Sequence, residues 1–351
     1  MLPRGTDVYI VGGGPAGLAA AIAVRRKGFD VTVSDSAMPP VDKACGEGIM
    51  PDGLAAARAL GLDLESAGQP FQGIRFREAG DGVQARFPHG LGRGIRRTIL
   101  HRIMTDAAAA EGVHLAWGVR VSGLSMEGVE VDGRQVRARW IVGADGGNSS
   151  VRRWAGLDTS LREGRRYGFR RHYRVEDPGD FMELHWSDRG QVYLTPVAPH
   201  EICAVLISRD QRLRLGDALA DFPDVAERLA GAQPLNLERG GLTMSRKLRS
   251  VTKGNVALTG DASGSVDAIT GEGLCLLFQQ ALALADSLAG GGLAAYEEDH
   301  RRIGRRPEWM SRLMLTLDGR RTLRRTAFRL FEFQPQVFAN LLAFHVGDFS
   351  V

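Results

Sequence analysis

Apolar runs separated by glycine-rich turns open the chain. Residues 8–11 are an apolar run that predicts a strand, and the glycine-rich segment 12–17 follows it. Residues 18–24 then form an apolar stretch that favours a helix, and a second short strand at 31–33 ends at the acidic residue Asp35. This order of strand, glycine turn, helix and strand is typical of a βαβ unit.

The middle of the chain has the alternating pattern of an antiparallel sheet. Apolar and polar positions alternate from residue 167 to residue 206, and segments 72–87 and 236–248 also have the pattern of strands. Apolar runs predict further strands at 140–143 and 255–259. We expect helices at residues 51–65, 98–111 and 211–231 and from residue 294 onward. The pattern therefore predicts an α/β fold in which a Rossmann-like domain is interleaved with an antiparallel sheet.

The first glycine-rich turn has the residues of a dinucleotide site. Gly12, Gly14 and Gly17 fit the pattern Gly-x-Gly-x-x-Gly, in which the glycines allow a tight turn and close approach of a pyrophosphate. Asp35 lies 23 residues after Gly12 and can accept hydrogen bonds from ribose hydroxyls. This turn alone does not separate FAD from NAD.

A glycine-rich stretch late in the chain identifies the dinucleotide. Gly-Asp-Ala-Ser-Gly at 260–264 follows the strand at 255–259, and Ala-Ile-Thr-Gly-Glu-Gly-Leu at 268–274 opens a long apolar helix. An acid at the end of a strand can hold ribitol hydroxyls, and a helix N-terminus can hold a pyrophosphate or the electron-rich edge of a flavin. Two such devices far apart in sequence suit FAD.

With Gly-Ala-Asp-Gly-Gly-Asn-Ser-Ser-Val-Arg at 143–152, these motifs resemble the flavoprotein monooxygenase superfamily. Para-hydroxybenzoate hydroxylase is its familiar member, and geranylgeranyl reductases and flavin-dependent halogenases share the scaffold. The resemblance extends over residues 8–275 and implies non-covalent FAD, with NAD(P)H as a transient reductant. The loop Cys-Gly-Glu-Gly at 45–48 resembles the Cys-Gly-x-Gly loop of the geranylgeranyl reductase branch, which lies against the flavin ring.

The resemblance assigns cofactor roles by position. Arg97 would reach FAD from a helix start, Val121 would flank the adenine, and Asp261 would bind ribitol or pyrophosphate. The sequence departs from the pattern at Ala268, where relatives usually have Pro, and at His101, where relatives often have Asp. The full set expected to bind FAD is Gly12, Gly14, Pro15, Ala16, Gly17, Asp35, Ser36, Cys45, Gly46, Arg97, Val121, Asp145, Gly260, Asp261, Gly271, Gly273 and Leu274.

The pattern and the resemblance together predict discontinuous domains. The FAD-binding domain is expected at 1–71, 96–160 and 251–293. The substrate domain, built on the antiparallel sheet, is expected at 72–95 and 161–250. A C-terminal helical region follows at 294–351.

Four residues are candidates for catalysis. Cys45 can donate a proton near the flavin N5 atom, and packing as a small apolar side chain is its alternative role. Glu47 shares that loop, with a solvated surface acid as the alternative. His172 and Tyr193 lie on predicted strands of the substrate sheet and can serve as acid, base or hydrogen-bond partner for a phenol, although a lone histidine on a sheet is more often structural.

Composition narrows the class of protein and its partners. The apolar fraction of 44% and the charged fraction of 25% exclude disordered and fibrous classes. A net charge of +4 does not indicate nucleic acid. The three cysteines form no Cys-x-x-Cys pair, so neither a metal site nor a disulfide framework is expected, and a cytoplasmic location fits best. No run of 18 apolar residues exists, and the first strand begins too early for a signal peptide.

The tail is basic and amphipathic. Residues 299–329 contain ten Arg against three acidic residues, and apolar positions repeat there at helical spacing. Two amphipathic helices that close a pocket for a small hydrophobic substrate account for this pattern. The alternative is peripheral contact with an anionic membrane surface, from which such a substrate is drawn.

Three reactions compete. A monooxygenase that hydroxylates a hydrophobic, possibly lipid-like phenolic secondary metabolite through a flavin C4a-hydroperoxide is favoured, because short members with this loop and tail resemble such hydroxylases. The loop at 45–48 favours the alternative, a geranylgeranyl reductase-type enzyme acting on a carbon–carbon double bond. A halogenase is disfavoured, because no Trp-x-Trp-x-x-Pro segment occurs. A flavin-binding module without activity is the remaining class, and NAD(P)H turnover would exclude it.

Overall fold

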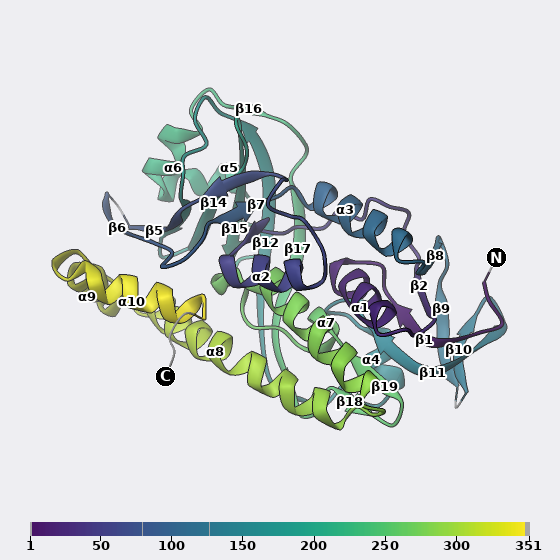
Figure 1. Cartoon of the computed structure of the whole chain (residues 1–351). Helices are drawn as coiled ribbons and strands as arrows, with labels where there is room; N and C mark the ends of the chain where they lie inside the picture. Colours follow the sequence, from purple (N-terminus) through teal and green to yellow (C-terminus); the bar gives the residue numbers. More distant parts are fainter. Residues whose placement is uncertain (1, 79, 126, 348–351) are drawn as a thin grey trace.

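The computed structural model describes residues 2–78, 80–125 and 127–347. Figure 1 shows a sheet flanked by α1, α3 and α7, a second sheet beside it, and the C-terminal helices along one side of the molecule. The first sheet has the order β18-β19-β11-β1-β2-β8, in which β19, β11, β1, β2 and β8 run parallel. Its strands are β1 (Gly5–Val11), β2 (Val31–Asp35), β8 (His114–Trp117), β9 (Val121–Ser125), β10 (Gly128–Val131), β11 (Arg134–Gly143), β18 (Thr252–Lys253) and β19 (Val256–Leu258).

The second sheet has the order β16-β12-β15-β14-β13-β5-β6, with β17 also paired to β12. All its neighbours are antiparallel except β13 and β5. Because β5 and β6 come from an early segment, the second sheet is interleaved with the first along the chain, which confirms the expected α/β fold. Its strands are β5 (Gly73–Glu78), β6 (Asp81–Arg86), β12 (Ser160–Arg174), β13 (Met182–Trp186), β14 (Gly190–Ala198), β15 (Glu201–Ser208), β16 (Gln233–Pro234) and β17 (Arg239–Leu248).

A small third sheet ties the two main sheets together. It pairs β3 (Gly48–Ile49) with β7 (Gly92–Gly94), and β7 with β4 (Gln69–Phe71). Gly94 packs closely on β14, because a side-chain carbon added at Gly94 would lie 1.8 Å from the carbonyl oxygen of Pro196. The loop that precedes β3 is thereby held against the second sheet.

Helix α1 (Pro15–Arg26) is the centre of the core. Every residue from Leu18 to Val24 is buried, so the helix is apolar on all sides and is covered by the sheet and by neighbouring helices. It packs on α3 (Arg97–Ala110) and α7 (Gly273–Ala289). The shorter helices of this half are α2 (Pro51–Ala59), α4 (Ser150–Trp154), η2 (Gly260–Ser263) and η3 (Ala268–Thr270).

Two predicted helices differ from the structure. The helix expected at 51–65 ends as α2 at Ala59, where Gly61 in the left-handed conformation turns the chain. The segment 211–231 is broken, because Pro223 lacks the N–H that a continuous helix needs. It forms α5 (Leu215–Ala218), η1 (Leu219–Asp221) and α6 (Pro223–Arg228).

The C-terminal region forms three helices where two were expected. They are α8 (Ala294–Gly319), α9 (Arg321–Phe333) and α10 (Pro335–His345), separated by the non-helical residues Arg320 and Gln334. Helices α9 and α10 contact β6, and α8 contacts η3, so together they cover one side of the second sheet. None of the described helices is long and apolar enough to cross a membrane. Residues 348–351 of the predicted region lie outside the described residues.

Candidate active site

The first glycine turn is shaped by two glycines and borders open space at a third. A side-chain carbon at Gly12, whose φ is +112°, would lie 2.4 Å from the carbonyl oxygen of Ala144. One at Gly17 would lie 1.8 Å from the carbonyl oxygen of Gly12. At Gly14 the nearest atom would be Nη2 of Arg97, 3.9 Å away. Pro15, Ala16 and Gly17 begin α1, as expected of a helix start that faces a pyrophosphate.

Two polar side chains hold this turn. Asp35, expected at the ribose, accepts hydrogen bonds from the N–H of Gly13 and the N–H of Ala37, both at 2.8 Å. Nε2 of buried His101 lies 2.9 Å from the carbonyl oxygen of Gly13, so this departure from the family pattern still supports the turn. Burial lowers the pKa of His101, so it is a neutral ring. Ser36 follows Asp35 and is exposed.

The late glycine-rich stretch lies against the first one. Gly260 has a φ of +57°, and a side-chain carbon there would lie 2.4 Å from Cβ of Ala16. Asp261 lies in η2 and is exposed. Leu274, at the start of α7, is buried. The sequence therefore brings the two glycine-rich motifs together, as FAD binding requires.

The residues present fit FAD. A side-chain carbon added at Gly46 or Gly273 would meet no atom within 4 Å, so both glycines border open space, as Gly14 does. Nε of Arg97 is buried and has no hydrogen-bond partner among the described residues, which leaves it available to a ligand. A turn, two glycine-rich loops and an unpaired cation are what a long anionic cofactor needs.

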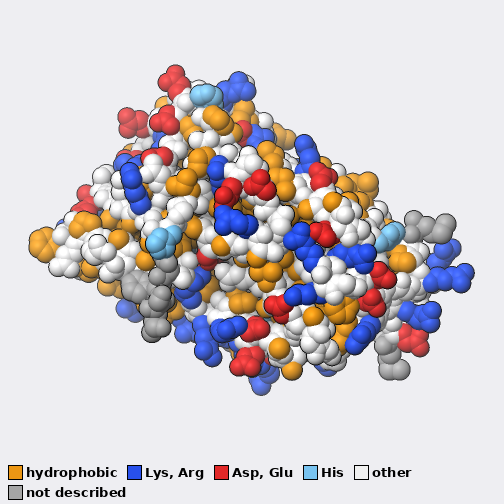
Figure 2. Space-filling view, in the orientation of Figure 1, with side chains coloured by type: hydrophobic (Ala, Val, Ile, Leu, Met, Phe, Trp, Pro, Cys, Tyr) orange, Lys and Arg blue, Asp and Glu red, His pale blue; other side chains and the backbone are white. Residues whose placement is uncertain are grey.

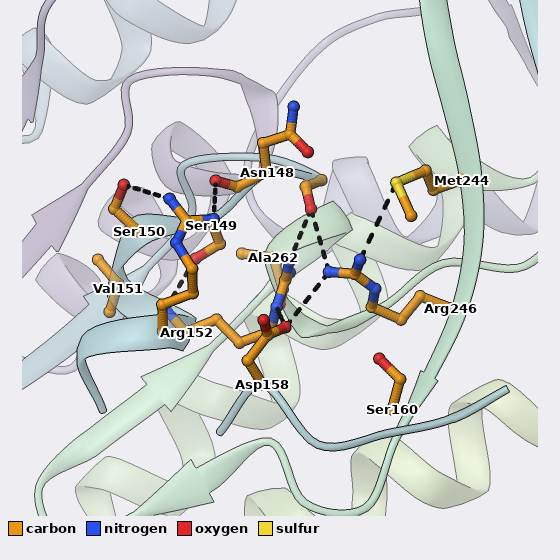
Figure 3. A network of polar contacts seen from close by, with 12 residues as sticks. Asn148, Ser149, Ser150, Val151, Arg152, Asp158, Ser160, Met244, Arg246 and Ala262 are labelled. Carbon is orange, nitrogen blue, oxygen red and sulfur yellow. Dashed lines mark hydrogen bonds and ion pairs between the residues drawn. The ribbon is translucent and has the colours of Figure 1, made fainter. Parts of the chain in front are cut away.

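The motif at 143–152 is fixed by a buried guanidinium (Figure 3). Arg152 donates to the carbonyl oxygens of Gly147 at 2.8 Å and Ala262 at 3.0 Å, and its Nε lies 2.7 Å from Asp158. Arg246 also reaches the carbonyl oxygen of Gly147 and the carboxylate of Asp158. Arg152 thus joins this motif to the η2 loop. Arg152 is the last residue of the sequence motif at 143–152, and its place in that motif was the signal from which its role could have been predicted.

Of the residues expected to bind FAD, Asp145 has hydrogen-bond partners within the protein and Val121 lies in a strand. Oδ2 of Asp145 accepts from the N–H of Ser150 at 2.6 Å and of Val151 at 3.2 Å, so it pairs with the first two N–H groups of α4, whose N-cap is Ser149. Its Oδ1 atom is buried without a partner among the described residues. Val121 is buried as the first residue of β9.

The loop at 45–48 is built around a buried glutamate. Glu47 has a φ of +61°, rare for a residue with a side chain. Its carboxylate accepts from the N–H of Arg97 at 2.9 Å, from Arg170 at 2.6 Å and from His172 at 2.6 Å. Burial alone would raise the pKa of Glu47. The bonds and charges of His172, Arg97 and Arg170 outweigh burial and lower the pKa, so Glu47 is ionised.

Cys45 lies beside this cluster as a neutral thiol. Its Sγ atom accepts from the N–H of Glu47 at 3.4 Å, and burial raises its pKa. Cys203 donates to the carbonyl oxygen of Cys45 at 3.7 Å. Ligand atoms of Glu47, His172 and Cys203 lie within 4.8 Å of one another. The Glu47 carboxylate is already bound to Arg170 and His172, so the cluster is better described as an ion-paired network than as a metal centre.

An apolar pocket lies where the second sheet meets the C-terminal helices. Its walls include Phe76, Met182, Leu184, Met314 and Phe338. Both glycine-rich loops reach this pocket at Met182. A side-chain carbon at Gly48 would lie 3.2 Å from Sδ of Met182, and one at Gly271 would lie 3.6 Å from its Cε atom.

The polar groups of the pocket wall are bonded to backbone atoms. The hydroxyl of Tyr193 donates to the carbonyl oxygen of Ile269, and burial raises its pKa well above 10. The hydroxyl of Thr270 donates to the carbonyl oxygen of Asp267 at 3.2 Å. Nε2 of His345 lies 3.2 Å from the carbonyl oxygen of Thr270.

The structure therefore divides the four catalytic candidates. Cys45, Glu47 and His172 come together in the ion-paired network, whereas Tyr193 lies in the pocket wall. Arg170 was missed, because an arginine within a strand pattern carries no signal of burial. Glu272 and His345, which lie next to the pocket, were also missed as chemical groups. Glu272 stands inside the quoted motif, but nothing in the pattern around His345 marks it.

A Rossmann-like parallel sheet with these loops defines an FAD-dependent oxidoreductase. The FAD binding domain family matches residues 5–210, more than half of the chain, and the chain belongs to this family.

The chain is similar to two reductases over most of their length. It is 27% identical over 318 residues to digeranylgeranylglycerophospholipid reductase of Methanosarcina acetivorans, covering 83% of this chain and 75% of that protein. It is 27% identical over 327 residues to menaquinone reductase of Mycolicibacterium smegmatis, covering 83% and 78%. The structure of p-nitrophenol 4-monooxygenase from Pseudomonas putida superposes with a TM-score of 0.83 at 16% identity over 99% of both chains, which shows a shared fold.

Proposed function

We propose that this FAD-dependent oxidoreductase reduces a carbon–carbon double bond in a long apolar, lipid-like substrate, with NAD(P)H as the source of electrons. The observation that carries the proposal is the pocket, whose wall is almost entirely hydrocarbon. Phenol hydroxylation, which the sequence favoured, calls for a group that orients or ionises a hydroxyl. The hydroxyl of Tyr193, our candidate for that task, is bonded to Ile269 instead.

The two reductase relatives support the same choice. Their names specify lipid and quinone substrates, and they match four-fifths of this chain. An unsaturated hydrocarbon tail needs an apolar tunnel and no partner for a hydroxyl, which agrees with the pocket wall.

FAD, when bound, supplies the two-electron chemistry of the reaction. The protein's own groups position it. The N–H groups at the start of α7 are unpaired within the helix and can stabilise negative charge at the edge of the flavin. Met182 touches both glycine-rich loops, so a substrate in the pocket is held next to them and away from water.

The proposal can be tested anaerobically. Enzyme reduced with NAD(P)H is mixed with a polyprenyl lipid or menaquinone, and mass spectrometry follows the product. A gain of two hydrogen atoms is expected. Product that forms only with oxygen and carries one added oxygen atom would overturn the proposal and restore the phenol hydroxylase.

A matched pair of variants tests whether the pocket holds the substrate. Leu313 and Leu315 are both half-buried on α8, and only Leu313 lines the pocket. We expect Leu313→Trp to lower turnover about tenfold or more with normal FAD content, because the indole fills the pocket. Leu315→Trp should retain activity close to that of the wild type, and equal losses in both variants would place the substrate elsewhere.

We further propose that the substrate enters from an anionic membrane surface. The buried side of α9 contributes to the pocket wall. Figure 2 shows hydrophobic side chains at the tip where Figure 1 places α9, with Lys and Arg side chains along the lower edge of the same view. Phe333 is 82% exposed. The other exposed side chains of this face include Leu323, Leu330, Arg325 and Arg329.

Flotation with vesicles of anionic and of neutral lipid tests this surface. We expect low-salt binding to anionic vesicles that is lost in Leu330→Ser/Phe333→Ser. Leu237→Ser is the control, because Leu237 is also 82% exposed and lies between β16 and β17. Absence of wild-type binding at low salt would refute the membrane surface and leave the reductase proposal standing.

A further inference from the structure

A buried acid and a buried imidazole, each with one unpaired atom among the described residues, meet beside the pocket. Glu272 is 2% exposed and immediately precedes α7. Its Oε1 atom lies 3.6 Å from Nδ1 of His345. Oε2 of Glu272 and Nδ1 of His345 are buried and have no hydrogen-bond partner among the described residues. Because buried polar groups are normally bonded, such a pair calls for an explanation.

We infer that Glu272 and His345 form a proton path into the pocket, in which Glu272 holds the proton and His345 delivers it to the substrate carbon. This inference rests on the proposed function. His345 is one of the residues that line the pocket, and Glu272 lies behind it, in the loop expected to face the flavin.

The other polar groups of the pocket are less suited to this task. Burial raises the pKa of the Tyr193 hydroxyl well above 10, which makes it a poor acid. Cys45 is not among the described residues that line the pocket. Thr270 has a hydroxyl that does not donate protons near neutral pH. Among the described lining residues, His345 is the one whose ring has an unpaired nitrogen, Nδ1, and this atom faces Glu272.

The surrounding charges set the protonation of the pair. Burial raises the pKa of Glu272 to about 8, an effect that Arg306 on α8 opposes and Asp52 on α2 reinforces. Burial, together with Arg306, lowers the pKa of His345 to about 4. Asp52 and Arg306 form an ion pair at 2.9 Å. The remaining titratable neighbour, Cys275 on α7, has a pKa raised well above 9 by burial. At neutral pH, Glu272 is therefore a neutral acid and His345 a neutral base.

The proton step is balanced with electrons from the reduced flavin. In the resting structure Nε2 of His345 faces the carbonyl oxygen of Thr270 at 3.2 Å, so the ring turns from this acceptor when it serves the substrate. As the C–H bond forms on the substrate, the Nε2–H bond of His345 breaks, and its Nδ1 atom takes the proton from the O–H group of Glu272. The ring ends as the other neutral tautomer, and Glu272 ends as a carboxylate. Glu272 regains a proton from water before the next turnover, and the ring returns to its first tautomer.

Two variants and one control test the path. Glu272→Gln keeps the shape of the side chain and removes its acidic proton, and His345→Gln removes the ring. We expect both to lower anaerobic turnover at least tenfold while FAD binding and its reduction by NAD(P)H continue. Wild-type turnover should fall as pH rises through about 8, whereas the residual turnover of Glu272→Gln should not. His185→Gln is the control, because His185 is buried and alternates with the pocket residues of β13.

Infrared spectroscopy gives a readout that does not depend on turnover. The FAD-loaded wild type should show a protonated carboxyl band at pH 7 that disappears above pH 8 and is missing in Glu272→Gln. An active wild type whose two variants keep its rate and pH profile, or the lack of this band, would overturn the proton path alone. A wild type that shows the band but reduces no double bond would overturn the proposed function, and the path as a route to that substrate with it.

Discussion

The chain contains two Gly-Glu-Gly tripeptides, at 46–48 and 271–273, and their glutamates are in opposite chemical states. Both are buried, and both tripeptides lie against Met182. Glu47 is bonded to a cation, a histidine and a backbone N–H, and its pKa is lowered. Glu272 has one unpaired oxygen and a pKa raised to about 8.

The difference comes from elements far away in sequence. Glu47 receives its partners from β12 and α3, and they supply enough positive charge to overcome burial. Glu272 faces α10, which supplies a neutral ring, and α2, which supplies another acid. The local sequence thus decides where an acid stands, and the tertiary partners decide whether it is charged.

The largest effect is expected from Glu47→Gln, which leaves His172 without its carboxylate and Arg170 with Asp42 alone. Breaking a buried ion pair costs about 3 kcal/mol or more, because the remaining charge stays buried. Denaturant unfolding at pH 7 measures the loss. The matched control is Glu272→Gln, which breaks no ion pair and removes an acid whose ionisation is unfavourable in the folded state, so we expect it not to lower the free energy of unfolding at this pH. Equal losses in the two variants would contradict the contrast between the loops.

The next largest difference expected between the two glutamates is in how the free energy of unfolding depends on pH. The pKa of Glu272 is raised in the folded state, so its contribution is lost as pH rises from 4.5 through about 8. The pKa of His345 is lowered to about 4, so its effect appears only as pH falls below 6.5. Between pH 6.5 and 8 the free energy of unfolding should therefore fall by about 2 kcal/mol in the wild type. Thermal or urea unfolding of apo protein should show a flatter profile in Glu272→Gln, and parallel profiles would refute the raised pKa.

Glycine substitutions test whether both loops face the cofactor. A side chain at Gly46 or Gly273 meets no protein atom within 4 Å, so Gly46→Val and Gly273→Val should fold normally. If the flavin lies between the loops, each should weaken FAD binding about tenfold, a change of about 1.4 kcal/mol. Fluorescence titration of apo protein with FAD measures this. Gly304→Val is the control, because Gly304 also has open space around it and lies on α8. Normal affinity in either loop variant would remove that loop from the flavin site.

The smallest effect is expected at Cys45. Its thiol is buried against the Glu47 loop, so Cys45→Ala should cost about 1 kcal/mol of stability through lost packing. If protons enter from Glu272, turnover should stay within about threefold of the wild type. A much larger loss, with normal flavin reduction by NAD(P)H, would identify Cys45 as the proton donor that the sequence suggested.

The sequence allowed the α/β fold and the FAD-binding class of the protein to be predicted, because short-range patterns determine them. Gly12 and Gly17 are needed by contacts within the turn itself, and their spacing is visible in the chain. The order of the motifs also indicated that the cofactor is FAD, because the end of a strand and the start of a helix each have a local sequence signature.

Charge states and the pocket wall could not be predicted in this way. Arg170 lies 123 positions from Glu47, and His345 comes from the last described helix, so their pairing depends on packing between distant elements. Tyr193 was placed on the right strand, but the partner of its hydroxyl depends on how η3 packs there. The tail breaks into three helices next to Gly319 and at Pro335, two helix-breaking residues that our prediction of two helices did not take into account.

The buried guanidinium of Arg152 has a consequence for how the protein opens. One side chain bonds the loops that carry Gly147 and Ala262, which are more than a hundred residues apart. Neither loop can move away from the other without breaking hydrogen bonds of Arg152. Amide hydrogens of both loops should therefore exchange as one cooperative unit, and bound FAD should slow the exchange of the two together.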